Sequence, residues 1–215
     1  MTIRVFLLDD HALVRTGLRM ILSAQSDIEI VGEAESGEEA LPLIRSLKPD
    51  VVLCDLHLPG ISGLEVTERI VRAHARCRVV IVSVLEDGPL PKRLLDVGAS
   101  GYVGKGGDAG ELLNAVRNAV RGKRYLGSSI ARNMALASVG GDESPFDQLS
   151  PRELEVAMLL VQGMRQDAIA RRLSLSPKTV NTHKSRLFDK IGVEDNIALA
   201  RLAARYGLMD PATSL

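Results

Sequence analysis

The sequence predicts an α/β doubly wound, five-stranded parallel sheet followed by an all-α four-helix domain. Over the first 121 residues, short apolar runs that end in a polar residue alternate with helical segments, the pattern of βαβ units. From about residue 148 onward the strand pattern stops and only short, capped helical segments follow. We therefore expect two domains of different class.

The α/β part is expected to alternate strictly between strand and helix. Strands are predicted at residues 3–8, 28–34, 50–55, 78–83 and 100–104. Helices are predicted at residues 11–24, 37–47, 63–74, 89–97 and 108–121. This alternation fits the sheet order 2-1-3-4-5, in which ligands bind at the switch point between the first and third strands.

The remaining chain divides into a linker and a helical domain. Residues 122–147 are predicted to be a linker with one helix-capable piece at 128–138, and Gly140–Gly141 and Pro145 indicate a loop at the boundary. Residues 148–210 form the second domain, which opens with the capping pattern Ser150-Pro-Arg-Glu153. Its helices are expected at residues 150–161, 165–172, 176–190 and 194–206.

Charge is distributed unevenly although the net charge of the 215 residues is zero. Residues 1–105 carry 12 basic and 15 acidic side chains, whereas residues 150–207 carry 10 basic and 6 acidic ones. This asymmetry favours a cation as partner of the first domain and a polyanion as partner of the second. The two cysteines lack metal-ligand spacing, and no signal peptide or apolar stretch of ~18 residues is present, so we expect a cytoplasmic protein without a membrane partner.

Polar residues end four of the predicted strands: the Asp9–Asp10 pair, Asp55, Ser83 and Lys105. The carboxyl ends of parallel strands share one edge of the sheet, so these residues should form one acidic pocket. Neighbouring carboxylates stay ionised when a cation shares their site, and Mg²⁺ suits such oxygens. Asp55 could then attack phosphorus and form an aspartyl phosphate, with Lys105 and Ser83 binding the phosphoryl oxygens.

Two other functions use similar residues. A Mg²⁺-dependent phosphatase of the haloacid dehalogenase type also has a nucleophilic Asp, a Ser or Thr and a Lys, but it needs a second Asp two residues after the nucleophile, where this chain has His57. A phosphate-independent scaffold that binds protein through its helical domain is the other alternative. Each pocket residue by itself is also typical of a turn, a cap or a solvated surface.

Residues 1–121 resemble the CheY-like receiver domain of bacterial two-component response regulators, on the Asp9–Asp10 pair, Asp55, Ser83 and Tyr102-Val-Gly-Lys105. The resemblance implies that a sensor histidine kinase phosphorylates Asp55, and that the domain promotes only its own phosphorylation and dephosphorylation. It implies that Asp10, Asp55 and the His57 carbonyl hold Mg²⁺ directly, with Asp9 acting through water. It also implies a switch in which Ser83 moves toward the phosphoryl group and Tyr102 turns inward.

The predicted helix 176–190 exposes hydroxyl, amide and cationic side chains, which suits the major groove of DNA as well as the solvated face of an ordinary bundle. The motifs LSPRE, SPKTV and KIG around it resemble the LuxR-type helix-turn-helix of the NarL/FixJ class. That resemblance implies a homodimer on an inverted-repeat promoter site, paired through helix 194–206. Bases would be contacted by Asn181, Thr182 and Ser185. Phosphates would be contacted by Lys178, Thr179, Lys184 and Lys190.

Shorter segments resemble one subgroup of that class, the GacA/UvrY regulators. They are Gly88-Pro-Leu-Pro-Lys92, Glu143-Ser-Pro-Phe146 and SPKTVNTH. This resemblance implies a sensor kinase of the GacS/BarA type and activation of genes for small regulatory RNAs. Activation by release of the DNA-binding domain and activation by receiver dimerisation both remain open.

Overall fold

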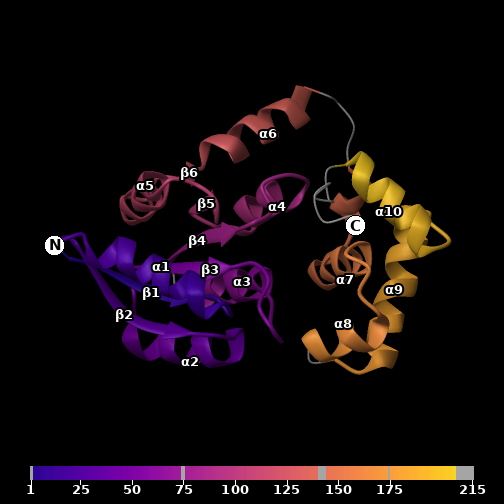
Figure 1. Cartoon of the computed structure of the whole chain (residues 1–215), viewed down its shortest axis with the longest axis horizontal. Helices are drawn as coiled ribbons and strands as arrows, with labels where there is room; N and C mark the ends of the chain where they lie inside the picture. Colours follow the sequence, from indigo (N-terminus) through magenta and orange to yellow (C-terminus); the bar gives the residue numbers. More distant parts are fainter. Residues whose placement is uncertain (1, 74–75, 140–143, 174, 207–215) are drawn as a thin grey trace. The chain divides into compact units, whose positions relative to one another are not determined.

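The computed structural model describes residues 2–73, 76–139, 144–173 and 175–206 (Figure 1). The chain forms two compact units, one of Met1–Glu86 with Pro91–Asn133 and the other of Asp87–Leu90 with Met134–Leu215. The division at Asn133/Met134 falls inside the segment that the sequence marks as a linker. None of the described helices combines the length and the apolar character needed to cross a bilayer.

The first unit is a parallel sheet in which the described residues form six strands in the order β2-β1-β3-β4-β5-β6. The strands are β1 Ile3–Leu8, β2 Ile28–Ala34, β3 Val51–Asp55, β4 Arg78–Ser83, β5 Gly101–Gly104 and β6 Tyr125–Leu126. Its helices include α1 Ala12–Ser23, α2 Gly37–Leu47, α3 Gly63–Ala73 and α5 Ala109–Val120, whereas α4 Leu90–Val97 and α6 Ser128–Val139 each contain residues of both units. The predicted order of the first five strands is confirmed, whereas the predicted number of strands is wrong by one.

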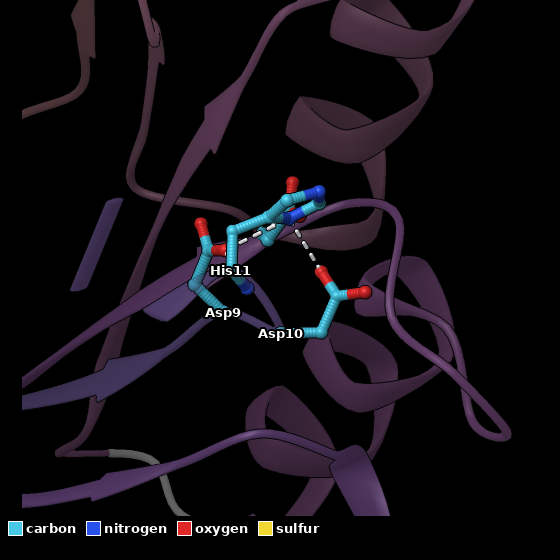
Figure 2. A group of neighbouring side chains, drawn as sticks. Asp9, Asp10 and His11 are labelled. Atoms are coloured by element: carbon cyan, nitrogen blue, oxygen red, sulfur yellow. Dashed lines mark hydrogen bonds and ion pairs between the residues drawn. The ribbon is translucent and has the colours of Figure 1, made fainter. Parts of the chain in front are cut away.

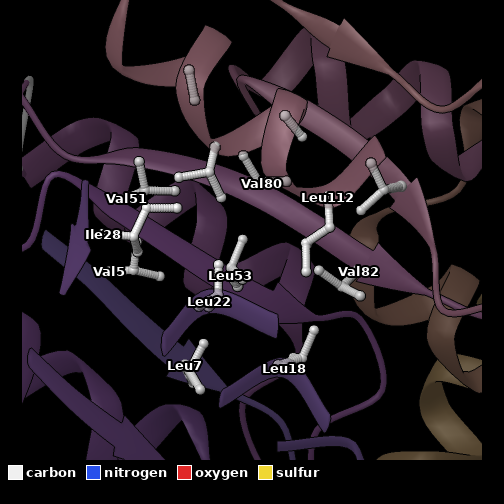
Figure 3. Packing of buried hydrophobic residues seen from close by; sticks show 14 residues of the cluster. Val5, Leu7, Leu18, Leu22, Ile28, Val51, Leu53, Val80, Val82 and Leu112 are labelled. Atoms are coloured by element: carbon white, nitrogen blue, oxygen red, sulfur yellow. The ribbon is translucent and has the colours of Figure 1, made fainter. Parts of the chain in front are cut away.

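The sheet is covered on both faces, which explains why its strands are almost continuously apolar. Val5 and Leu7 of β1 point into a cluster with Leu18 and Leu22 of α1 and Leu112 of α5 (Figure 3). Successive side chains alternate along a strand, so the fully buried Phe6 lies on the opposite face, where α2 packs. The two layers of helices hold the strand ends, and therefore the polar residues that follow them, in fixed register.

The sixth strand arises because the start of the predicted linker folds onto the sheet. Tyr125 N donates to Ser100 O at 3.0 Å and Gly127 N donates to Tyr102 O at 2.9 Å. The Glu111 carboxylate then accepts bonds from the amide and hydroxyl of Ser128, at 2.9 and 2.6 Å, and holds the first turn of α6. Gly140, Gly141 and Asp142 of the predicted loop lie outside the described residues.

The second unit is helical. It contains the short 3₁₀ helix η1 Pro145–Gln148 and the helices α7 Pro151–Val161, α8 Gln166–Arg172, α9 Pro177–Ile191 and α10 Asn196–Arg205. The predicted capping box is present, with Ser150 and Glu153 each bonding the backbone of the other. Gly192 ends α9 in a left-handed conformation at φ +71°, which glycine adopts without steric cost. The predicted end of the domain, at 207–210, lies outside the described residues.

Candidate functional site

Strand register brings the predicted pocket residues together at one edge of the sheet. Leu8 pairs with Cys54, so Asp9, which follows β1, lies beside Asp55, the last residue of β3. Ser83 ends the next strand, β4, and pairs with Gly104, which directly precedes Lys105. The four predicted strand ends thus form one acidic site from residues that are far apart in the sequence.

Lys105 binds two carboxylates of this site at once. Its Nζ lies 2.8 Å from Asp9 Oδ2 and 2.9 Å from Asp55 Oδ2. Both aspartate side chains are 2% exposed and the lysine side chain is 12% exposed. Burial acts to lower the pKa of Lys105, but its hydrogen bonds and ion pairs with Asp9 and Asp55 outweigh burial and raise that pKa above the ordinary value. The ammonium group is therefore charged, and it offsets part of the carboxylate repulsion.

The remaining carboxylate oxygens suit a metal ion. Asp55 Oδ1 is buried and has no hydrogen-bond partner among the described residues, which costs free energy unless a ligand binds it. One ligand atom from each of Asp9, Asp10, His11 and Asp55 lies within 4.8 Å of the other three (Figure 2). Carboxylate oxygens are the ligands that Mg²⁺ prefers, so the three carboxylates of this group fit that ion. His11 was not predicted from the sequence; its position directly after the aspartate pair was the available signal.

The predicted switch residues lie on the next two strands. Ser83 is fully buried, and its Oγ accepts a hydrogen bond from Leu85 N at 3.1 Å. Tyr102 is also fully buried, and its hydroxyl donates to Leu85 O at 2.5 Å. Burial raises the pKa of Tyr102, so this phenol stays protonated and remains a donor. Tyr102 is therefore in the inward orientation and is linked, through Leu85, to the β4–α4 loop that follows Ser83.

The loop after Asp55 is held by a carboxylate of α2. Gly60 adopts φ +72°, a backbone conformation that favours glycine, and a Cβ there would meet Glu38 Oε1 at 2.3 Å and displace that carboxylate. Glu38 Oε1 accepts a hydrogen bond from Ile61 N at 3.0 Å. This anchors the segment that begins with His57, whose carbonyl was predicted as a metal ligand.

A second candidate surface is the exposed face of α9. Lys178, Asn181, Thr182 and Ser185 are exposed, and their spacing of three, four and seven residues puts them on one side of the helix. The opposite side is buried through Val180, Leu187 and Ile191. The helix is thus fixed by its apolar side and presents a polar side to a partner.

Several predicted DNA contacts already have partners within the chain. Thr182 Oγ1 donates to Lys178 O at 3.0 Å, and the Thr179 hydroxyl lies 2.8 Å from Ser176 Oγ. Lys184 Nζ lies 5.1 Å from the centroid of the Phe188 ring, a cation–π contact. Lys190 Nζ lies 2.6 Å from Glu153 Oε2, so Lys190 joins α9 to the capping box of α7. That ion pair was not predicted, and it gives Lys190 a structural role.

Two family models match the chain. One, described as "Response regulator receiver domain", matches residues 5–117. The other, described as "Bacterial regulatory proteins, luxR family", matches residues 147–203. The first match covers most of the unit that contains the acidic pocket, and the second covers most of the helical unit.

Similar proteins extend over nearly the whole chain. The response regulator GacA of Pseudomonas viridiflava is 45% identical over 97% of this chain and 98% of its own length. The response regulator UvrY of Escherichia coli K12 is 41% identical over 98% of each chain. Among solved structures, the RcsB response regulator of Salmonella typhimurium has a TM-score of 0.75 at 27% identity, covering 96% of this chain and 98% of that one. RcsB bound to the promoter P1flhDC with the phosphomimetic BeF₃⁻ has a TM-score of 0.72 at 27% identity, covering 95% of this chain and 100% of that one.

Proposed function

Because the chain belongs to the two-component response regulators that join a receiver domain to a LuxR-type DNA-binding domain, we propose that Asp55 is its phosphoacceptor. A sensor histidine kinase supplies the phosphoryl group, and the phosphorylated protein binds promoter DNA as a homodimer to regulate transcription. The observation that carries this proposal is the Asp55 carboxylate, which is buried at a strand end with Oδ1 unpartnered among the described residues and Oδ2 bound to Lys105.

The pocket residues have separate tasks in the transfer. An Asp55 oxygen forms the new O–P bond as the N–P bond of the kinase phosphohistidine breaks, so Asp55 must be ionised and accessible in line. Lys105, already bonded to Asp55 Oδ2, is close enough to shift onto a phosphoryl oxygen. Asp10, Asp55 and the His57 carbonyl would hold Mg²⁺ directly and Asp9 would hold it through water, and the bound ion would supply charge neutralisation.

The switch begins with the Ser83 hydroxyl. In the structure this hydroxyl accepts from Leu85 N and also hydrogen-bonds with the Tyr102 hydroxyl, and a phosphoryl oxygen on Asp55 would offer it a new acceptor. Movement of Ser83 would alter the Leu85 carbonyl that Tyr102 now bonds at 2.5 Å. Ser83 and Tyr102 therefore pass the state of Asp55 to the β4–α4 loop.

In the second unit, α9 enters the major groove of the promoter DNA. Asn181, Thr182 and Ser185 face bases, while Lys178, Thr179 and Lys184 contact phosphates. Lys190 contacts phosphate only at the expense of its bond to Glu153. Helix α10 pairs two domains on an inverted repeat.

The similarity to GacA and UvrY supports a more specific assignment. We propose a kinase partner of the GacS/BarA type and promoters of small regulatory RNA genes as targets, both encountered in the cytoplasm. Genome-wide footprinting of wild type and Asp55→Asn tests this. Phosphate-dependent occupancy of such promoters is expected, and occupancy confined to other genes would contradict the assignment.

Phosphorylation is tested with acetyl phosphate and Mg²⁺ on a phosphate-affinity gel. Wild type should give a retarded band and Asp55→Asn should give none, because the amide is not a nucleophile. Asp96→Asn, at an exposed position of α4, is the matched control and should be retarded like wild type. Retardation of Asp55→Asn would show that another residue is the acceptor.

DNA recognition is tested by competition footprinting with specific and scrambled duplexes at two salt concentrations. Thr182→Ala should change base preference at one position, by about 1–3 kcal/mol for a direct base contact. Lys184→Ala should weaken binding to all sequences and reduce the salt slope by about one. Lys123→Ala, an exposed site of the receiver unit, is the control. Equal loss of specific and scrambled binding in Thr182→Ala would remove Thr182 from the base contacts.

A further inference from the structure

One side-chain contact ties helix α6 to the loop that follows Ser83. Asn133 of α6 is partly buried, and its Nδ2 donates to the backbone carbonyl of Glu86, in the β4–α4 loop, at 3.4 Å. These two residues end the two stretches that make up the first unit, Met1–Glu86 and Pro91–Asn133. The contact therefore closes the first unit at both places where the chain passes from it into the second.

The first turn of α6 is anchored independently of that loop. Ser128 is bonded to the Glu111 carboxylate of α5 through both its amide and its hydroxyl, and Ile130 is fully buried. Further along the helix the cover decreases, and Leu136 is 66% exposed. Loss of the Asn133 contact would thus loosen the later turns of α6 while its first turn stays in place.

The carbonyl that Asn133 binds belongs to a loop that must move with Ser83. Ser83 Oγ accepts from Leu85 N at 3.1 Å, and Leu85 directly precedes Glu86. The Glu86 side chain lies so close to Gly104 of β5 that a Cβ there would overlap its Oε1. A movement of Ser83 toward a phosphoryl oxygen on Asp55 would therefore turn the adjoining peptide groups, and with them the Glu86 carbonyl.

Added charge on Asp55 would act on the same loop. Burial raises the pKa of Tyr102 most, and the Asp55 and Glu86 carboxylates raise that pKa further, so both carboxylates act on one buried phenol. A phosphoryl group makes the Asp55 side chain more negative, and like charges repel across a poorly solvated site. Phosphorylation would therefore push on the Glu86 side chain while it draws on Ser83.

We propose that the bond between Asn133 and Glu86 is a latch that is closed in the unphosphorylated protein and opened by phosphorylation of Asp55, so that α6 carries the state of the first unit into the second. The inference rests on the proposed function, because it takes Asp55 as the phosphoacceptor. A hydrogen bond between neutral, partly buried groups changes an equilibrium constant by about two- to tenfold. That is enough to bias two arrangements of α6 and small enough for phosphorylation to reverse.

The latch can be tested from the side of the pocket, because coupling between two sites is reciprocal. If phosphorylation opens the latch, then a mutation that opens it must favour the phosphorylated form. Asn133→Ala should therefore bind the phosphoryl analogue beryllium trifluoride, in the presence of Mg²⁺, about two- to tenfold more tightly than wild type in a fluorine NMR titration. Asn114→Ala, at an exposed position of α5, is the matched control and should bind like wild type.

The latch can also be tested from the side of the helix, by hydrogen exchange of the full-length protein at the amides of residues 133–136. In wild type these amides should exchange about two- to tenfold faster after treatment with acetyl phosphate. In Asn133→Ala they should exchange faster already without phosphate and respond little to it. In Asp55→Asn they should not respond to acetyl phosphate.

The contrary outcomes separate the latch from the proposed function. Wild type that gains one phosphate on Asp55, measured by mass, without a change in the exchange of α6 would overturn the latch and leave the proposed function standing. Equal or weaker binding of beryllium trifluoride by Asn133→Ala would also overturn the latch, since the contact would then be indifferent to the active state or part of it. Wild type that takes up no phosphate would overturn the proposed function, and the latch with it.

Discussion

Two buried carboxylates, Asp55 in the first unit and Glu153 in the second, are held in opposite ways. Glu153 is 3% exposed, and its Oε2 accepts from Ser150 N at 2.7 Å and from Lys190 Nζ at 2.6 Å. Asp55 is 2% exposed and shares a single lysine with Asp9, and its Oδ1 has no hydrogen-bond partner among the described residues. The Glu153 carboxylate is thus compensated by partners within the chain, whereas the Asp55 carboxylate is compensated only in part.

The difference separates a structural buried charge from a functional one. A buried charge is tolerated when hydrogen bonds and an opposite charge compensate it, as at Glu153. The pocket of Asp55 concentrates negative charge that Lys105 offsets only in part, and it therefore favours the arrival of a cation, whose charge would in turn reduce the repulsion of a phosphoryl group.

The largest expected effect is that of Lys105→Met. Removing the ammonium leaves Asp9 and Asp55 as uncompensated buried charges, and we expect the first unit to lose about 3 kcal/mol of unfolding free energy in metal-free buffer. Hydrogen exchange of the full chain measures this locally, through the amides of β3 and β4 against those of α7. Added Mg²⁺ should restore part of the loss.

The control is Lys92→Met, at an exposed position of α4, which should leave exchange unchanged. If the amides of Lys105→Met showed the same hydrogen exchange as those of this control, repulsion in the pocket would not destabilise the first unit. The proposed difference between Asp55 and Glu153 would then be wrong.

The second effect is that of Glu153→Ala. This change removes half of a capping box and leaves Lys190 without its partner, and we expect the second unit to lose about 2 kcal/mol of unfolding free energy. Protection from hydrogen exchange should be lost in α7 while β3 keeps it. Glu194→Ala, at an exposed site before α10, is the matched control. Metal should not rescue Glu153→Ala, and rescue by Mg²⁺ would indicate that the two carboxylates are not independent.

The sequence predicted the pocket better than the contacts of Glu153, for a physical reason. Apolar runs define strands and parallel strands align their carboxyl ends, so the amino-acid order alone was enough to group Asp9, Asp55, Ser83 and Lys105. The capping box was also predictable, because it is local in sequence. The Lys190–Glu153 bond joins residues 37 apart on packed helices, and no local pattern encodes it.

The same limit explains the other differences. Strand β6 has two residues, too few to show a period of two, and it forms because β5 offers a free edge. The bond from Glu111 to Ser128 depends on the packing of α5 beside that strand. The inward orientation of Tyr102 depends on the surrounding core, in which its side chain is fully buried.

The third effect has the opposite sign. Asp55→Asn removes a negative charge from the pocket while its amide oxygen can still accept from Lys105, so we expect about 1 kcal/mol of stabilisation of the first unit in metal-free buffer. The corresponding change in the second unit, Glu153→Gln, should destabilise it. Denaturation with a chelator present measures both. A destabilised Asp55→Asn would mean that the native carboxylate is satisfied after all.

The smallest effect is the pH dependence of the two lysine–carboxylate contacts. The contact of Glu153 should stop stabilising the protein at low pH, and the contacts of Lys105 should stop stabilising it at high pH. Burial acts to raise the pKa of Glu153, but the bonds from Lys190 and Ser150 outweigh it and lower that pKa below the ordinary 4.5. Its contribution to stability is thus complete above 4.5 and is lost as pH falls through the folded value. The pKa of Lys105 is raised above 10.5, so its contribution is complete below 10.5 and is lost as pH rises through the folded value. The hydrogen-exchange protection of α7 should therefore be the same in Glu153→Gln and wild type at acidic pH. The protection of β3 should be the same in Lys105→Met and wild type at basic pH. Equal protection at the opposite end of the pH range, for either pair of proteins, would refute the assigned partners.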